Sequence, residues 1–285
     1  MFPGVDDRSM VPDASGPTID ASGAEIPALG LGTARMDGEE CRRAVETALT
    51  VGYRHVDTAQ MYDNEAAVGE AIEASDVPRE EIFVVTKVNT DNMAAEDVRE
   101  STRDSLDRLR LDTVDLLLVH APRDYVPLEE TLGAMNGLQE EGLVEHVGVS
   151  NFSVSQLEDA IDASATPIVT NQVKYHPYHR QDDVLAFCID EGICLTAYSP
   201  LARGDVVDDQ RLAEIGEAHE KTAAQVALRW QLQQPYVATI PKASSREHVE
   251  ANADVFDFEL SPDEMRSVFD VGEPLSNGLA DRMGM

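Results

Sequence analysis

Basic residues are scarce in this chain of 285 residues. It has 22 lysines and arginines against 54 aspartates and glutamates, which gives a formal net charge of −32 at pH 7. The acidic residues are spread along the whole chain rather than gathered in a tail. Because proteins bind DNA, RNA and anionic membranes through lysine and arginine, this composition disfavours all three as partners.

So much negative charge points to a particular solvent. Self-repulsion on this scale is tolerated mainly where salt screens it, since the Debye length falls to about 3 Å at 1 M ionic strength. Lysine is especially rare, and the composition resembles that of proteins from salt-accumulating halophiles. An ordinary acidic cytosolic enzyme is the alternative interpretation.

Cysteine pairs and long apolar runs are also missing. The three cysteines are an odd number without a Cys-x-x-Cys pair, so a disulfide framework is not indicated. No stretch approaches 18 uninterrupted apolar residues, and no charged segment followed by an apolar one opens the chain. We expect a soluble, cytoplasmic protein without a bound metal.

What the chain does have is a regular alternation of two kinds of segment. Short apolar or β-branched runs, typical of buried strands, occupy 27–34, 53–58, 82–88, 114–120, 144–150, 168–173, 193–198 and 237–241. Helix-patterned stretches lie between most of them, at 39–49, 65–74, 94–109, 128–140, 155–163, 183–190 and 211–233, the last being one helix or two. Such alternation predicts parallel strands with crossover helices. Eight units fit an α/β fold, one (β/α)₈ TIM barrel of about 250 residues.

The ends of the chain differ from this pattern. Residues 1–18, rich in proline and glycine, are expected to form a loose tail, followed by a short hairpin through 19–26. No interdomain linker is visible, so 19–285 is interpreted as a single barrel domain. Beyond the last strand we expect a helix at about 261–269 and a glycine-containing tail, both placed over or under the barrel.

Four polar side chains stand at or just beyond the ends of these apolar runs. Asp57, Lys87 and His120 close three of them, and Tyr62 follows Asp57 by five residues. In a barrel, all strand ends open on the same mouth, so these residues should converge there. Taken singly, a strand-end aspartate or histidine is more often a capping residue, and a rim tyrosine more often packing. The joint occurrence favours a catalytic cluster.

The four residue types suggest proton transfer to a carbonyl oxygen. Tyrosine is a donor with a pKa of about 10, and lowering it towards 7 requires about 4 kcal/mol. An ammonium about 4 Å away at an effective dielectric near 20 is worth about that much, so Lys87 is expected to lower the pKa of Tyr62. Asp57 would keep Lys87 charged, and His120 would hydrogen-bond the carbonyl oxygen.

At this point the chain resembles a known family, the aldo-keto reductases, over about 19–260. Within it, the prokaryotic 2,5-diketo-gluconate and methylglyoxal reductase group is the most similar. The resemblance rests on seven motifs in register: Gly30-Leu31-Gly32-Thr33, the run from Gly52 to Ala59, Thr86-Lys87, the run from Gly148 to Phe152, Asn171-Gln172, the run from Ala197 to Leu201, and Ile240-Pro241-Lys242.

The resemblance implies that a nicotinamide cofactor donates hydride to an aldehyde or ketone while Tyr62 donates the proton. No Gly-x-Gly-x-x-Gly follows the first strand, so a Rossmann fold is not the route to cofactor binding. By resemblance, Tyr198 would stack on the nicotinamide, and Ser150, Asn151 and Gln172 would hold its carboxamide. The remaining cofactor contacts implied are Gly32, Thr33 and Asp57 at the mouth, Ser199 and Leu201 at the pyrophosphate, and Lys242, Ser244, Arg246 and Asn252 at the adenosine half.

Two departures from the family pattern affect specificity. Ala121 follows His120 where many relatives have a tryptophan that walls the substrate pocket. His248 occupies the position where the family often has an arginine for the 2′-phosphate, but Arg246 lies two residues earlier. We therefore expect NADPH, with NADH possible, and a small-molecule carbonyl substrate for a monomeric enzyme.

Two other function classes remain open from the sequence. Lys87 could form a Schiff base in an aldolase-type lyase. Alternatively, the barrel could sense nucleotides without turnover, although retention of Asp57, Tyr62, Lys87 and His120 argues against that.

Overall fold

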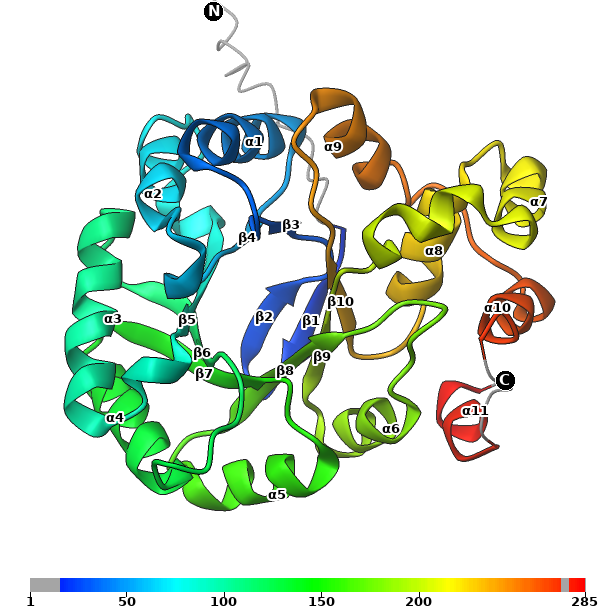
Figure 1. The fold of residues 1–285 in the computed structure, drawn as a ribbon. Helices are drawn as coiled ribbons and strands as arrows, with labels where there is room; N and C mark the ends of the chain where they lie inside the picture. Colours follow the sequence, from blue (N-terminus) through cyan, green and yellow to red (C-terminus); the bar gives the residue numbers. More distant parts are fainter. Residues whose placement is uncertain (1–15, 273–276, 285) are drawn as a thin grey trace, which may run out of the picture.

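The computed structural model describes residues 16–272 and 277–284, and it is an eight-stranded parallel barrel surrounded by helices (Figure 1). The barrel strands follow one another in sequence order around the sheet. They are β3 (Leu31–Gly32), β4 (His55–Asp57), β5 (Phe83–Val88), β6 (Val114–Val119), β7 (Val144–Ser150), β8 (Ile168–Lys174), β9 (Cys194–Tyr198) and β10 (Val237–Ile240). The predicted α/β barrel is confirmed.

Side chains along each strand alternate between the barrel interior and the helices, as the pleat requires. On β5 and β6, Val85, Leu116 and Leu118 belong to an inner apolar cluster, whereas Val84 and Leu117 belong to the larger outer one. Both faces are apolar because parallel strands are covered on both sides. This explains the nearly continuous apolar runs in the sequence.

The barrel closes between its last strand and its first. The Gly30 amide donates to the Thr239 carbonyl at 2.9 Å, and the Thr239 amide donates to the Ala28 carbonyl at 2.8 Å. The predicted strand at 27–34 is therefore too long, since only Leu31–Gly32 pairs regularly with β4. A Cβ on Gly32 would lie 2.7 Å from the Ile240 carbonyl oxygen, so a residue without a side chain is required at this closure.

Helices form the outer layer (Figure 1). The range predicted at 211–233 is two helices, because Glu220 adopts a left-handed backbone (φ 57°) and Thr222 then caps the second helix through a capping box. The α-helices are α1 (Gly38–Val51), α2 (Glu65–Glu73), α3 (Ala95–Leu109), α4 (Leu128–Glu140), α5 (Val154–Ala163), α6 (Asp182–Glu191), α7 (Gln210–His219), α8 (Ala223–Leu232), α9 (Arg246–Ala253), α10 (Pro262–Phe269) and α11 (Asn277–Met283). Short 3₁₀ helices are η1 (Gln60–Tyr62), η2 (Arg79–Glu81), η3 (Thr90–Asn92) and η4 (Ala202–Asp208).

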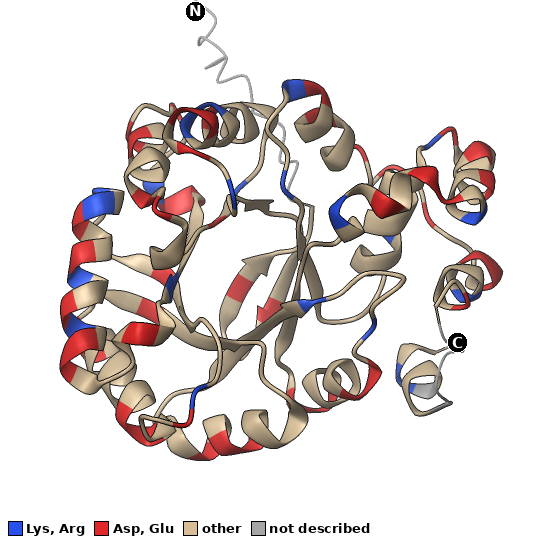
Figure 2. Ribbon diagram, viewed as in Figure 1, with Lys and Arg blue, Asp and Glu red and all other residues tan. Residues whose placement is uncertain are grey.

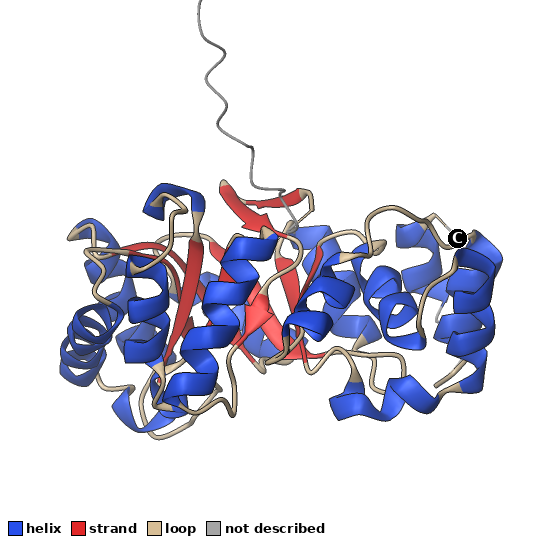
Figure 3. Cartoon of the chain, turned by 90° about the horizontal axis from the view of Figure 1, so that it is seen from above, coloured by secondary structure: helices blue, strands red, loops and turns tan. Residues whose placement is uncertain are grey.

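The predicted hairpin covers one end of the barrel (Figure 3). Strands β1 (Thr18–Ala21) and β2 (Ala24–Pro27) pair antiparallel, and Ala21, Ala24 and Ile26 pack into the inner apolar cluster. The hairpin thus fills the end opposite the carboxyl ends of the strands. The part of the predicted tail at 1–15 lies outside the described residues.

The C-terminal segment packs on the outside of the barrel rather than over its mouth (Figure 1). Arg180 binds it through a 2.6 Å hydrogen bond to the Phe269 carbonyl at the end of α10. The predicted helix at 261–269 is confirmed as α10, capped by Ser261. The final tail was predicted without a helix, but the chain forms α11, which packs against α6.

Candidate active site

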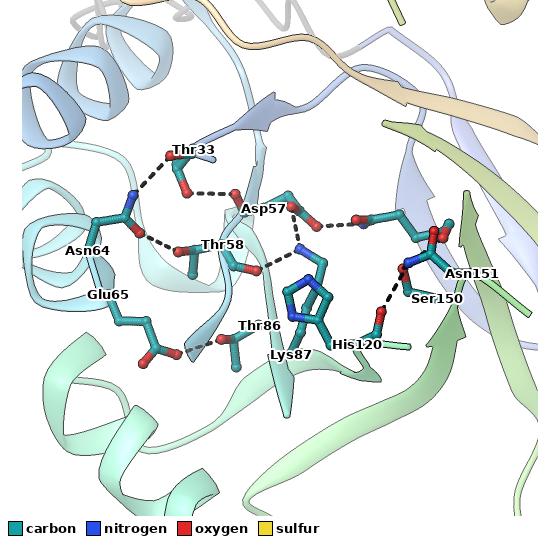
Figure 4. A network of polar contacts seen from close by, with 11 residues as sticks. Thr33, Asp57, Thr58, Asn64, Glu65, Thr86, Lys87, His120, Ser150 and Asn151 are labelled. Atoms are coloured by element: carbon teal, nitrogen blue, oxygen red, sulfur yellow. Dashed lines mark hydrogen bonds and ion pairs between the residues drawn. The ribbon is translucent and has the colours of Figure 1, made fainter. Parts of the chain in front are cut away.

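The four candidate catalytic residues meet at the carboxyl ends of the strands. Asp57 ends β4, Lys87 lies one residue before the end of β5, His120 directly follows β6, and Tyr62 ends η1. Figure 4 shows the Lys87 amine pointing at Asp57, with the His120 ring beside it. Parallel strands therefore bring together groups that are far apart in the sequence, as expected.

A buried ion pair lies at the centre of this cluster. The Lys87 and Asp57 side chains are 0% and 2% exposed, and Lys87 Nζ lies 2.6 Å from Asp57 Oδ1. Lys87 Nζ also donates to the Thr58 carbonyl at 2.7 Å, while Asp57 Oδ2 accepts from Gln172 Nε2 at 2.6 Å. Both charged groups thus form hydrogen bonds to further polar groups in addition to their ion pair. These hydrogen bonds compensate the free-energy cost of burying two charges.

The environment keeps Lys87 protonated. Burial favours the neutral amine, but Asp57 and Tyr62 outweigh it, and the pKa of Lys87 is raised above its ordinary value. A Schiff-base nucleophile must be a free amine, which enzymes obtain by lowering the pKa of a lysine. The direction of this shift argues against the aldolase-type lyase.

Tyr62 lies above the ion pair. Lys87 Nζ is 5.1 Å from the centroid of its ring, and the His120 ring meets it edge-on with centroids 5.7 Å apart. Burial raises the pKa of Tyr62, and the nearby Lys87 opposes this shift without reversing it. The expected fall in the pKa of Tyr62 towards 7 is therefore wrong, because the sequence does not reveal how much water the barrel removes from the phenol.

His120 is neutral at physiological pH. Burial, reinforced by the positive charge of Lys87, lowers its pKa to about 4. Its Nδ1 is buried, and no described residue hydrogen-bonds to it. A neutral imidazole can donate one hydrogen bond without transferring a proton.

Three of the residues expected at the nicotinamide are hydrogen-bonded to this cluster and to one another. Asn151 Nδ2 donates to the His120 carbonyl at 3.1 Å and to Ser150 Oγ at 2.9 Å, and Ser150 Oγ donates to the Gln172 carbonyl at 2.8 Å. The Tyr198 hydroxyl donates to Asn151 Oδ1 at 2.9 Å, which fixes the plane of the half-buried ring. A flat aromatic face and amide groups therefore lie beside the ion pair.

Residues expected at the pyrophosphate and mouth follow the strand ends around the barrel. Thr33 Oγ1 donates to the Asp57 carbonyl at 2.9 Å, and Gly32 lies against β10. Ser199 adopts a left-handed backbone (φ 51°) directly after β9, and Leu201 packs half-buried against the outer core. These residues thus lie at or just beyond the carboxyl ends of β3 and β9.

The residues expected at the adenosine half lie at α9. Lys242 and Ser244 are exposed just before it, Arg246 is its first residue, and Asn252 is buried near its end. Arg246 pairs with Glu250 at 2.6 Å, and Lys242 lies 3.6 Å from Glu40. Aromatic face, amides and then cations form the donor set that a nicotinamide dinucleotide requires, so these residues fit that cofactor.

A polar network behind the cluster was not identified from the sequence. Asn64 accepts from Thr58 Oγ1 at 2.8 Å and donates to the Thr33 carbonyl at 2.9 Å. Buried Glu65 accepts from Thr86 Oγ1 at 2.5 Å and from Arg108 at 2.6 Å. Figure 4 shows these side chains supporting the segments that carry Asp57 and Lys87. In the sequence, Asn64 and Glu65 look only like the start of a helix.

Two features of the described residues bear on other functions. Within 16–272 and 277–284, no three His, Cys, Asp or Glu side chains gather as metal ligands. Over the same residues, no helix combines the length and the apolar character needed to cross a bilayer.

Comparison with known proteins identifies relatives along most of the chain. The aldo/keto reductase family model matches residues 28–273. Methylglyoxal reductase DkgB of Escherichia coli O157:H7 is 40% identical over 246 residues, covering 85% of this chain and 92% of that protein. Glyoxal reductase of Bacillus subtilis (strain 168) is 41% identical over 250 residues, with coverages of 87% and 89%.

Solved structures of reductases are also similar to this chain over most of its length. A putative 2,5-diketo-D-gluconic acid reductase B superposes with a TM-score of 0.89 at 47% sequence identity, covering 93% of this chain and 94% of that one. The aldose reductase of Schistosoma japonicum has a TM-score of 0.86 at 32% identity, with coverages of 94% and 96%.

Proposed function

This protein belongs to the aldo/keto reductase family, and from that premise we propose that it reduces small aldehydes, α-dicarbonyls or keto-sugars to alcohols with Tyr62 as general acid. Carbonyl reduction by an aldo-keto reductase is the activity that its methylglyoxal and glyoxal reductase relatives support. Family membership also implies the use of NAD(P)H.

The placement of Tyr62 over the Lys87–Asp57 ion pair is the observation that carries the proposal. Tyr62 stays protonated because burial raises its pKa, so its hydroxyl can donate to an oxygen that gains negative charge. The ammonium of Lys87 then stabilises the phenolate left behind, and Asp57 keeps that ammonium charged and oriented. Neutral His120 hydrogen-bonds the same carbonyl oxygen and sets its position.

Other residues orient the reactants. A bound reduced nicotinamide supplies the hydride. Tyr198 offers its ring face to that group, and Ser150, Asn151 and Gln172 offer amide and hydroxyl hydrogen bonds in a plane fixed by their mutual contacts. Because these residues are bonded to the His120 backbone and to Asp57, they hold the cofactor and the proton donor in a fixed relation.

The function is tested by a substrate screen with purified protein in molar KCl. Small aldehydes, α-dicarbonyls and keto-sugars are each offered with NADPH and with NADH while the nicotinamide absorbance is followed. Oxidation of NADPH that depends on the carbonyl compound supports the proposal. Absence of turnover for every class, with the protein folded by circular dichroism, would contradict it.

We also propose a preference for NADPH over NADH. A 2′-phosphate must be met by a cation, and arginine offers a fork of several donors. Arg246 is held only by an exposed i,i+4 pair with Glu250, an interaction worth about 0.3–0.5 kcal/mol, so it can exchange that carboxylate for a phosphate. Arg246→Ala should weaken NADPH about tenfold to a hundredfold and NADH much less, as measured by calorimetric dissociation constants.

Glu250→Gln is the matched control for this prediction. It removes the competing carboxylate and should tighten NADPH relative to NADH, opposite in sign to Arg246→Ala. Equal weakening of both cofactors in Arg246→Ala, or a wild-type preference for NADH, would show that Arg246 does not bind the 2′-phosphate.

A further inference from the structure

The distribution of unpaired cations is uneven in this acidic protein. Most arginines and lysines pair with a carboxylate within 4.0 Å. Within the described part of the chain, those without such a partner lie either on the outer helices, Arg43, Arg99 and Arg211, or at the mouth of the barrel, Arg35, Arg123, Lys174 and Arg203. In a chain with 54 carboxylates, four cations without a carboxylate partner around the same opening provide positive charge that an anionic ligand can meet there.

In Figure 2, acidic segments are spread over the outer helices with basic segments among them, and further lysine and arginine segments lie on the loops around the opening of the barrel. Three of the mouth cations adjoin residues already assigned to the cofactor. Arg35 follows Thr33 and accepts through its carbonyl from Lys242, Lys174 ends β8 beyond Gln172, and Arg203 belongs to the segment that follows Ser199.

Arg123 is placed differently. It lies on the loop that joins β6 to α4, three residues after His120, and none of the residues assigned to the cofactor comes from that loop. Its side chain is exposed, and Nη1 donates only to the Pro122 carbonyl at 3.1 Å, which leaves further donors of the guanidinium fork available. Its positive charge also contributes to lowering the pKa of His120, after the larger effects of burial and Lys87.

Apolar side chains accompany it. Tyr125, on the same loop, is 60% exposed, and Met61, directly before Tyr62, is 57% exposed. Large apolar side chains this exposed are few among the described residues, and these two belong to the loops that carry His120 and Tyr62. A short carbon chain can pack against such side chains while a charged end group reaches Arg123.

We propose that Arg123 binds the carboxylate of the carbonyl substrate, so that this reductase prefers aldehyde and keto acids to neutral carbonyl compounds of the same size. This inference rests on the proposed carbonyl reduction and adds a specificity residue to it. The guanidinium forms a charge-assisted, bidentate contact with the carboxylate. The carbonyl at the other end of the substrate then lies under Tyr62 and His120.

The test uses 4-oxobutanoate and its methyl ester, which carry the same aldehyde and differ in the carboxylate charge. Wild type should show a higher kcat/KM for the acid than for the ester at one fixed salt concentration. In Arg123→Gln the acid-to-ester ratio should fall about tenfold to a hundredfold, mainly through KM of the acid. Arg123→Lys should keep part of the preference, because it keeps the charge but loses the fork.

Arg43→Gln is the matched control. Arg43 is an equally unpaired, exposed arginine on α1, so its replacement makes the same change in net charge away from the mouth and should leave the acid-to-ester ratio at the wild-type value. An equal ratio in wild type and Arg123→Gln, or an equal fall in Arg43→Gln, would overturn the proposal.

Calorimetry separates the remaining outcomes. If Arg123→Gln weakens NADPH more than Arg43→Gln does, Arg123 binds a cofactor phosphate and the proposal is wrong. If wild type reduces neither aldehyde, the proposed function is judged by the full substrate screen, and the carboxylate site is judged separately by calorimetric binding of 4-oxobutanoate. Tighter binding to wild type than to Arg123→Gln supports the site, and equal binding contradicts it.

Discussion

Lys87 is held by the barrel more tightly than any other cation of the site. Its side chain is fully buried, and its ammonium donates to Asp57 and to the Thr58 carbonyl. Lys87→Met should reduce kcat by about 10² to 10⁴. The positive charge of Lys87 lowers the pKa of Tyr62, so its removal raises that pKa. Reduction requires protonated Tyr62 and is lost as pH rises through its pKa, so the basic limb of the pH profile should move to higher pH.

The readout of this variant must separate catalysis from folding. Removing one partner of a buried ion pair costs about 3–5 kcal/mol, so Lys87→Met is also expected to unfold at a lower temperature. The pH profile of the folded fraction is therefore the deciding measurement. A basic limb at the wild-type pH would show that Lys87 does not affect Tyr62.

Single residues show where sequence reasoning succeeds and where it stops. Asp57, Lys87 and His120 could be grouped from the sequence because each lies at the end of an apolar run and parallel strands end at the same mouth. The direction of the pKa shift of Tyr62 could not be predicted, because desolvation depends on how other segments cover the phenol. Asn64 and Glu65 were missed for the same reason, since their partners Thr33 and Arg108 are distant in sequence.

Helix packing in the outer layer can be tested with a pair of glycines. Gly69 lies inside α2, and a Cβ there would be 2.3 Å from the Leu109 carbonyl oxygen at the end of α3. Alanine is normally the better helix former, but here it must force the two helices apart. Gly69→Ala should lower the free energy of unfolding by about 1–3 kcal/mol in a chemical denaturation experiment.

Gly133→Ala is the matched control in α4. Nothing lies within 4 Å of the Cβ it would add, so this change should stabilise the protein by about 0.5–1 kcal/mol. If both variants change stability in the same direction, close packing between α2 and α3 is not the reason for Gly69.

The elements of the barrel could be predicted because periodicity and burial agree along most of the chain. The predicted range of β7 was correct at both ends. The sequence left open whether 211–233 is one helix or two, because glutamate at position 220 gives no strong signal for a left-handed backbone. Two predictions about the elements were wrong, and each error has a physical cause. Part of the first predicted strand pairs with Thr239 as the barrel closure, and α11 depends on packing against α6 that the sequence of a short tail does not reveal.

At the scale of the whole molecule, acidic segments are spread over the outer helices of the described chain (Figure 2). We propose that it is adapted to high salt. The screening distance grows from about 3 Å at 1 M to about 10 Å at 0.1 M, so repulsion between helices increases as salt is removed. The thermal unfolding midpoint should rise steadily between 0.1 and 3 M KCl.

An uncharged osmolyte provides the control for this prediction. Sucrose stabilises compact proteins by exclusion from the surface but does not screen charge. It should therefore not replace KCl at matched osmolality. A midpoint that is flat from 0.1 to 3 M KCl would contradict adaptation to high salt.

The proposed reaction depends most directly on one atom, the hydroxyl oxygen of Tyr62. The decisive measurement is kcat for a reduced carbonyl substrate in wild type and Tyr62→Phe, together with the calorimetric dissociation constant of NADPH for both. We expect kcat to fall by about 10² to 10⁴ while the affinity for NADPH stays nearly unchanged, because the change removes only the proton donor. Activity of Tyr62→Phe within a few-fold of wild type would remove Tyr62 from the mechanism.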